Sequence, residues 1–422
     1  MECDQSEPGL SRIVLDNGLT ILIQKKNTKS TSFGVGLRFG CVHQPAAHLI
    51  EHLLFKGTTA RTYKDINLQA VRWGGSLDAF TDFFSTFYVT KNLNRYAYDA
   101  LDLLCDMITN STIPLQEMEY EKRVLLEEIK MRSEEPESIL MDTLYKRLYP
   151  NHLLGNAVLD NRQLICSINH SEALEIYHQF YVPERTIVIG VGNIDEKAVL
   201  AIVKKYFHKP SRPIDELAIP PLAYPSPPRR IIIPRTNCQI HLMVGLGAVP
   251  CTHADYYPLR VLSATLGENI NSRLYERARE KQGLVYNITS HYNTMRSSWQ
   301  SVLKTDCSQW HGILRIYTRF SPRNLTPVET IIKEELERFT QKKISEKELL
   351  ISQQKLVGER KLATLGTFRH MHLLFTAEIN DTIGEFDEFD NKIYAVTPTG
   401  LLEVARKYSY PAKHISVILK PE

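Results

Sequence analysis

A proline-rich segment near the middle of the chain does most to limit what the chain can fold into. Residues 209–228 are rich in proline, and such a run resists both helix and sheet and acts as a semi-rigid spacer. The chain has 422 residues, which is more than one hydrophobic core usually serves. The sequence therefore predicts an N-terminal domain over 1–208, a linker over 209–228 and a C-terminal domain over 229–422.

The two predicted domains begin with similar sequences. Residues 12–15 (Arg-Ile-Val-Leu) are echoed by residues 230–233 (Arg-Ile-Ile-Ile), and residues 34–38 are echoed by residues 243–247. A helical stretch follows the second echo in each half. Strands and helices occur in clusters, not in strict alternation. We therefore expect an α+β fold of two homologous units, each a mixed or antiparallel sheet with helices on one face.

Periodicity and turn residues place the individual elements. The pair Asn17-Gly18 between β-branched flanks predicts a hairpin over 12–25. Further strands are expected at 31–39, 76–82, 85–91, 186–191 and 414–419. Helices are expected at 63–73, 95–110, 115–133, 137–148, 195–207, 253–268, 325–341, 346–362 and 397–407.

Composition excludes several classes of protein. The net charge of +3 is too small to indicate nucleic acid or an anionic membrane as the main partner. No stretch of about 20 apolar residues is present, so no membrane span is expected. The N-terminal residues lack a basic and apolar signal pattern. The seven cysteines are scattered and never form a Cys-x-x-Cys pair, which favours a reducing compartment. We therefore expect a cytoplasmic protein.

The run His48-x-x-Glu51-His52 is the strongest chemical signal in the sequence. On a helix, positions i, i+3 and i+4 share one face, so His48 and His52 can hold one metal ion while Glu51 lies beside it. Two imidazoles with a nearby carboxylate suit hydrolysis at Zn²⁺, because the carboxylate can handle the proton of the attacking water. A third ligand is still required.

An acidic helical stretch over 117–130 offers that third ligand. Glu121 and Glu128 are two helical turns apart and share a face, whereas Glu127 points elsewhere. Either Glu121 or Glu128 could approach the metal from a second helix. A carboxylate that completes a His₂Glu set with one open position is a recognised catalytic zinc arrangement.

The motifs together resemble the pitrilysin family of inverzincin metallopeptidases, in the branch of mitochondrial processing peptidase and its bacterial relatives. The resemblance rests on the residues around the histidine pair, on the run from Gly74 to Thr81 and on residues 272–286. It implies Glu128 as the third Zn²⁺ ligand, with Glu121 as a supporting residue. It also implies that Arg279 and Tyr286 form a functional pair.

The resemblance further implies an activity and an assembly. The activity is zinc-dependent hydrolysis of peptide bonds in unfolded peptides or small proteins, with Glu51 as general base. The substrate would add as a strand at the edge formed by Asp78, Ala79 and Phe80. Relatives of this length pair two such clam-shell halves, so a homodimer is expected. The alternative is a catalytically silent structural or partner subunit of the same fold.

Two features depart from the family pattern. The loop over 41–47 between Gly40 and the first histidine is several residues shorter than usual, and Phe84 stands where relatives often have an acidic residue. Within the edge-strand motif, Asp78 replaces the usual asparagine. His43 in the short loop is a candidate extra ligand, although a loop histidine is more often solvated. A phosphate- or nucleotide-binding α/β protein is a third alternative, with little support, because no glycine-rich phosphate loop precedes a helix.

Overall fold

The structure, a computed structural model, describes residues 9–150, 152–156, 162–213, 230–236, 239–294, 312–409 and 414–422. The chain divides into two compact units that exchange segments. The first unit comprises Met1–Lys130, Ala157–Leu217 and Leu362–Ile379. The second comprises Met131–Asn156, Ala218–Lys361 and Asn380–Glu422. The predicted domain boundaries stay a prediction, because residues 214–228 of the proposed linker lie outside the described residues.

The first unit is built on a six-stranded mixed sheet with the order β1-β2-β6-β3-β5-β4. Only β2 and β6 run parallel to each other among its neighbouring pairs. The predicted hairpin is confirmed, because β1 and β2 pair antiparallel. The strands are β1 (Leu10–Val14), β2 (Thr20–Lys25), β3 (Ser30–Leu37), β4 (Ser76–Thr81), β5 (Thr86–Leu93) and β6 (Thr186–Gly192).

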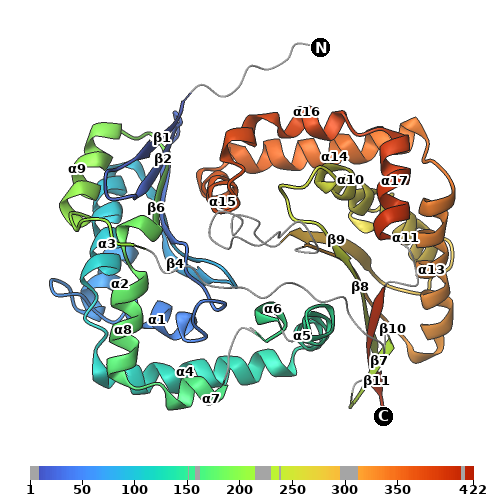
Figure 1. The fold of residues 1–422 in the computed structure, drawn as a ribbon, viewed down its shortest axis with the longest axis horizontal. Helices are drawn as coiled ribbons and strands as arrows, with labels where there is room; N and C mark the ends of the chain where they lie inside the picture. Colours follow the sequence, from blue (N-terminus) through green and yellow to red (C-terminus); the bar gives the residue numbers. More distant parts are fainter. Residues whose placement is uncertain are drawn as a thin grey trace. The chain divides into compact units, whose positions relative to one another are not determined.

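One face of this sheet carries the main core of the first unit. Alternate residues of β3 (Phe33, Val35 and Leu37) are fully buried in one cluster with apolar side chains of the covering helices. Figure 1 shows α3 and α9 lying together beside this sheet. The helices of the first unit before the linker are α1 (Ala47–Leu54), α2 (Tyr63–Arg72), α3 (Ala97–Asn110), most of α4 (Leu115–Glu134), α7 (Arg162–Ser167), α8 (His170–Phe180) and α9 (Glu196–Tyr206).

The opposite face of the first sheet is covered by α15 (Thr367–Ile379), which comes from the C-terminal half of the sequence. The glycines of β3 make room for it. A Cβ added to Gly36 would lie 2.0 Å from the Phe375 ring, so no larger residue fits without a shift of that ring. The salt bridge from Arg12 to the buried carboxylate of Glu378 (2.9 Å) also holds α15 to the sheet.

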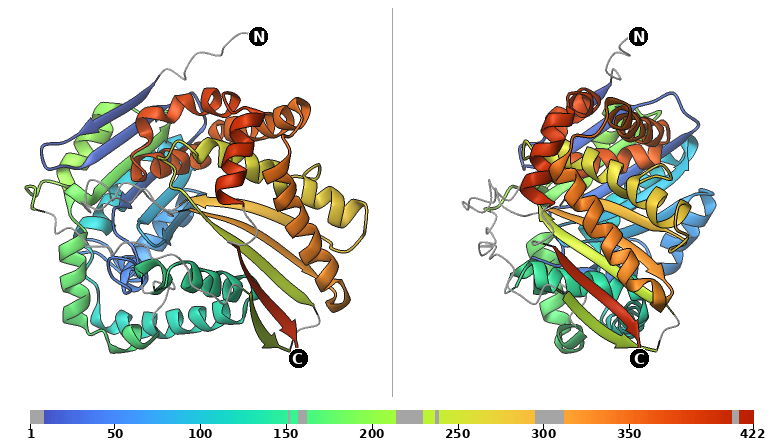
Figure 2. Two further views of the ribbon diagram at one scale, coloured as in Figure 1. Left: turned by 45° about the vertical axis from the view of Figure 1, so that its right-hand side comes forward. Right: turned by 90° about the vertical axis from the view of Figure 1, so that its right-hand side faces the viewer.

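The second unit repeats this plan with a five-stranded mixed sheet of order β7-β11-β8-β10-β9. β11 lies between β7 and β8, as Figure 2 shows near the C-terminus. Among the strands that the structure describes in this sheet, only β7 and β11 are parallel neighbours. β7 therefore occupies the place of β2, and not the place of β1 that the similar sequences suggest. The strands are β7 (Arg230–Arg235), β8 (Ile240–Ala248), β9 (Ile288–Thr294), β10 (Gly312–Phe320) and β11 (Ile415–Pro421).

The second sheet also has helices on both faces. Its main core packs against α10 (Tyr256–Gly267), α13 (Leu325–Gln341), α14 (Glu346–Leu365) and α17 (Pro398–Tyr408). Its other face is covered by α5 (Pro136–Leu148), which comes from the N-terminal half of the sequence. A Cβ on Gly245 of β8 would lie 2.5 Å from Leu144, so Gly245 serves α5 as Gly36 serves α15.

The α+β class with two mixed sheets is confirmed, and the structure adds a helix on the second face of each sheet. That helix was not expected, because in each unit it comes from the other half of the sequence. Shorter helices complete the second unit: α6 (Leu153–Asn156), α11 (Arg273–Tyr275) and α16 (Phe389–Tyr394). None of the helices that the structure describes is long and apolar enough to cross a membrane.

Candidate metal centre

Helix α1 presents two histidines at one point. Leu49, Ile50 and Leu53 have no exposed surface and anchor the helix in the core. The remaining face carries His48 and His52, whose Nε2 atoms lie 3.3 Å apart. Two nitrogens bound tetrahedrally to one Zn²⁺ would lie about 3.4 Å apart, given Zn–N bonds of about 2.1 Å. The spacing of the two imidazoles therefore fits a shared ion.

Helix α4 adds a carboxylate to this pair. Glu128 Oε2 lies 3.8 Å from His52 Nε2 and 4.0 Å from His48 Nε2. Of the described residues, His48, His52 and Glu128 form the group whose ligand atoms could hold a metal ion. Two imidazole nitrogens and one carboxylate oxygen are a donor set that Zn²⁺ accepts in catalytic sites. The residues present therefore fit the ion that the sequence motif implies.

Glu121 lies on the other side of the His52 ring. Its Oε2 is 2.9 Å from His52 Nδ1, and its Oε1 pairs with the ammonium group of Lys56. Because an ionised carboxylate only accepts hydrogen bonds, His52 Nδ1 carries the proton and Nε2 keeps its lone pair for a metal. Helical spacing left both glutamates open as the third ligand. In the structure Glu121 contacts His52 Nδ1, whereas Glu128 lies nearer to His52 Nε2, the atom that is free to bind a metal.

Glu51 is held beside the histidines by β4. The Thr81 hydroxyl donates a hydrogen bond of 2.5 Å to Glu51 Oε2, and the Glu51 side chain is buried. Burial raises the pKa of the Glu51 carboxyl above its ordinary value of 4.5, although the Thr81 bond and the nearby His48 oppose this. Sequence reasoning included Thr81 in a motif without giving it a role, and it missed the role of Lys56.

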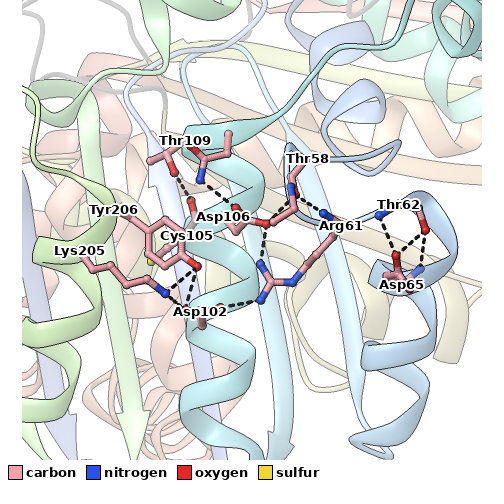
Figure 3. A network of polar contacts seen from close by, with 12 residues as sticks. Thr58, Arg61, Thr62, Asp65, Asp102, Cys105, Asp106, Thr109, Lys205 and Tyr206 are labelled. Carbon is pink, nitrogen blue, oxygen red and sulfur yellow. Dashed lines mark hydrogen bonds and ion pairs between the residues drawn. The ribbon is translucent and has the colours of Figure 1, made fainter.

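A polar network holds the loop that follows α1 (Figure 3). The Arg61 guanidinium donates to Asp102 and Asp106 of α3, at 2.6 Å each, and the Thr58 hydroxyl donates to Asp106. Lys205 of α9 joins the same network through Asp102. Burial by itself would raise the pKa of Asp102, but the hydrogen bonds from Lys205 and Arg61 outweigh it, so this pKa lies below its ordinary value. The loop that carries Lys56 is therefore tied to two core helices.

The short loop before α1 is fixed to the turn between β4 and β5. The amides of Cys41 and Val42 donate to the carbonyls of Asp82 and Phe83, at 3.0 and 2.8 Å. His43 Nδ1 accepts a hydrogen bond from the Gly40 amide. His43 thus stabilises its own loop and does not belong to the group of metal-binding geometry.

β4 forms an edge of the first sheet. Among the described strands, it pairs only with β5. Asp78 and Phe80 are exposed, and Ala79 is partly buried and faces the core with Thr81. The predicted edge strand is thus present as an edge, and Glu51 lies at its C-terminal end through the bond to Thr81.

Arg279 and Tyr286 lie in the second unit and contact each other. Arg279 comes from the π-helical turn η3 (Glu276–Glu280), and its guanidinium lies over the rings of Tyr286 and Tyr275, at 5.1 and 4.7 Å. The other cations of this basic run form close ion pairs with carboxylates: Arg273 with Glu348, Arg277 with Glu334 and Glu335, and Lys281 with Glu276. Arg279 has a longer ion pair with Glu280, at 3.7 Å, and differs from these cations in stacking on two phenol rings, with Tyr286 73% exposed.

Comparisons with known proteins agree with this architecture. Residues 20–162 match the protein family described as "Insulinase (Peptidase family M16)", and residues 167–356 match the family described as "Peptidase M16 inactive domain". The beta subunit of mitochondrial processing peptidase from Blastocladiella emersonii is 26% identical over 270 residues, 63% of this chain and 57% of that protein. A protease from Helicobacter pylori has the same fold, with a TM-score of 0.85, 20% identity and coverage of 99% of this chain and 100% of that one.

Similarity to a protein from Bacillus subtilis establishes the family of this chain. That protein is named an uncharacterized zinc protease, YmxG, and is 30% identical over 366 residues, which are 85% of either chain. The resemblance drawn from the sequence motifs is confirmed by this similarity and by the two family matches in chain order. The chain belongs to peptidase family M16, the insulinase or pitrilysin family.

Proposed function

We propose that this chain is a zinc-dependent endopeptidase that hydrolyses peptide bonds in unfolded peptides or small proteins. One observation carries the proposal. The Nε2 atoms of His48 and His52 lie 3.3 Å apart and can share one metal ion. The Glu128 carboxylate and the buried Glu51 lie beside them. The names of relatives as zinc proteases support the same activity.

In this proposal His48, His52 and Glu128 hold Zn²⁺. Bound zinc supplies Lewis acidity, which acidifies water and polarises a peptide carbonyl. Glu121 and Lys56 fix the orientation and tautomer of the His52 ring from behind, as outer partners of zinc-binding histidines commonly do.

Glu51 acts as the general base. It takes a proton from the attacking water and delivers it to the leaving amine. The bond from Thr81 fixes one carboxylate oxygen, so that the other is presented to the proton. Burial raises the pKa of Glu51, which makes its carboxylate a stronger base toward the proton of the attacking water.

The substrate binds in an extended form along β4. Backbone pairing at a free strand edge gives affinity with loose sequence preference, which suits unfolded chains. The edge at Asp78, Ala79 and Phe80 runs toward Thr81, the residue bonded to Glu51. Arg279 and Tyr286, a guanidinium and a phenol held together, supply donors to a peptide carbonyl or a developing oxyanion.

We further propose that two chains assemble as a homodimer around an enclosed chamber. Light scattering should then give a mass near twice 48.5 kDa. Cleavage of a stably folded protein should be much slower than cleavage of its unfolded form. Equal rates on both forms would show that the site is open and would end the chamber proposal.

Zinc analysis of the purified protein, combined with a peptide-library cleavage assay, tests the proposed activity. One zinc per chain and cleavage of unfolded peptides are expected. Absence of both would favour the alternative, a catalytically silent subunit with the same fold.

A further inference from the structure

An aromatic cluster lies against the proposed substrate strand in the first unit. Phe80 of β4 contacts His372 of α15, with ring centroids 5.6 Å apart. His372 also contacts Phe368 at 4.8 Å and Phe87 at 5.1 Å. Phe87 in turn stacks on Phe375 at 3.9 Å. These five residues (Phe80, Phe87, Phe368, His372 and Phe375) are called the aromatic platform below.

The platform has a rigid base and an open top. Phe87 and Phe375 are buried, at 2% and 6% exposure, because Gly34 and Gly36 of β3 leave space for their rings. The Phe80 side chain, by contrast, is 50% exposed, and His372 and Phe368 are partly exposed. A large aromatic ring half exposed on a braced cluster is suited to contact with another apolar group.

The alternation of β4 places this platform beside the substrate's path. Thr81 points to Glu51 on one face of the sheet, so Phe80 points to the other face, where α15 lies. A peptide strand added at the free edge would lie about 4.8 Å from β4 and direct every second side chain to the same face as Phe80. One of these side chains would rest against Phe80 and reach His372.

The chemistry of His372 fits an apolar occupant. Burial lowers the pKa of His372, so its imidazole is neutral at neutral pH. A neutral ring stacked among phenylalanines offers an edge and a face to an aliphatic or aromatic side chain, with no charge that needs a counter-ion.

We propose that the aromatic platform is a specificity subsite that selects a bulky apolar side chain of the peptide paired with β4, and that His372 sets this preference. The inference rests on the proposed function, since it assumes that peptide binds along β4. It adds a residue from the C-terminal half of the sequence to recognition in the unit that carries the metal donors. It also narrows the substrate class to unfolded segments with a large apolar residue near the cleaved bond.

Peptide binding and cleavage by His372 variants test this subsite. A series of unfolded peptides carries phenylalanine or alanine at one position at a time, and kcat/KM is measured for each. At one position the wild type should prefer phenylalanine by roughly tenfold, the range typical of apolar subsites. His372→Ala should reduce this ratio to about twofold, mainly through KM, and His372→Phe should retain it, because a ring still packs on Phe80.

The matched control is His178→Ala, which removes an exposed histidine from α8 in the same unit. This control should keep the wild-type ratio. Thermal unfolding of each variant shows whether it folds. If the Phe/Ala ratio of folded His372→Ala equals that of wild type and control at every position, the subsite assignment is wrong.

Binding measured in a Glu51→Gln background separates the two proposals. Fluorescence anisotropy of labelled peptides with this variant reports the subsite without turnover. A His372-dependent preference for phenylalanine in binding supports the subsite even if the wild type proves inactive. Zinc binding and cleavage with no dependence on residue 372 would overturn the subsite alone. No peptide binding at all, with or without His372, would overturn the subsite together with the edge-strand proposal.

Discussion

The two units share a strand-to-helix arrangement and differ in what their polar side chains do. In the first unit, β3 leads into α1, and polar atoms of His48, His52 and Glu128 converge on one point. In the second unit, β8 leads into α10, and the buried Glu268 is enclosed by Arg260 and Lys355, at 3.2 and 3.0 Å.

This difference teaches that the fold supplies a position and the side chains decide its use. Gly36 and Gly245 occupy equivalent strands and make the same space for an incoming helix, so the scaffolds agree in detail. The charges of the second unit neutralise one another and stabilise a core. The donors of the first unit face a common point and can bind an ion. Each prediction below changes one side of this contrast.

The largest effect is expected from Glu51→Gln. The amide keeps the shape of the side chain and can still accept the Thr81 bond, but it cannot take a proton. We expect kcat to fall by roughly 10³-fold or more, as for the loss of a general base, while zinc content and folding stay unchanged. Turnover near the wild-type rate would show that Glu51 is not the base.

Removal of a metal donor should weaken zinc binding. His48→Ala, His52→Ala or Glu128→Gln should lower zinc occupancy, measured by elemental analysis after dialysis. Added zinc should raise the melting temperature of wild type, because a ligand at 100 times its Kd stabilises the folded state by about 2.7 kcal/mol. The donor variants should lose this rise. Full occupancy in Glu128→Gln would point to Glu121 or Glu127 as the true ligand.

Much of the first unit could be predicted from local sequence. The hairpin, the strand before α1 and the helices α3 and α4 follow from periodicity and turn residues within short windows. The motif His48-x-x-Glu51-His52 lies on one helix, so helical spacing alone predicts that its two imidazoles meet. These features depend on contacts between residues near in sequence.

The missing parts depend on contacts distant in sequence. The helix α15 lies on a sheet formed more than 170 residues earlier in the chain, as the bond from Arg12 to Glu378 shows with a separation of 366 residues. No local pattern indicates such a partner. The same holds for Thr81 on Glu51 and for His372 on Phe80, because a side chain's orientation across a sheet is set by the assembled fold.

A smaller effect is expected from Lys56→Met. Lys56 pairs with Glu121 and lies near the rings of Tyr63 and Tyr120, and Glu121 fixes the His52 ring. Removing the cation frees Glu121 to turn away, so zinc affinity should fall by about 10- to 100-fold, the usual effect of losing an outer partner. Competition with a chromophoric chelator measures this.

The control for that variant is Lys122→Met. Lys122 lies on α4 and is buried, and it pairs with Glu119 and not with Glu121. Its zinc affinity should match the wild type. If both variants bind zinc as tightly as the wild type, Lys56 has no part in positioning His52.

The smallest effect concerns acid stability of the second unit. Burial by itself would raise the pKa of Glu268, but the charges of Arg260 and Lys355 outweigh it and lower this pKa below its ordinary value of 4.5. The ion pairs therefore contribute fully above pH 4.5, and this contribution is lost as the pH falls through the lower folded-state pKa. We expect Glu268→Gln to melt at a lower temperature than the wild type at neutral pH, because two cations lose their buried partner. The difference in melting temperature should narrow on acidification below pH 4.5.

Glu359→Gln, which alters an exposed partner of Lys355, should melt within about a degree of the wild type, because exposed ion pairs contribute little. Neither variant should change zinc content. A zinc loss in Glu268→Gln would mean that the polar network of the second unit supports the metal site of the first, and the contrast between the units would have to be redrawn.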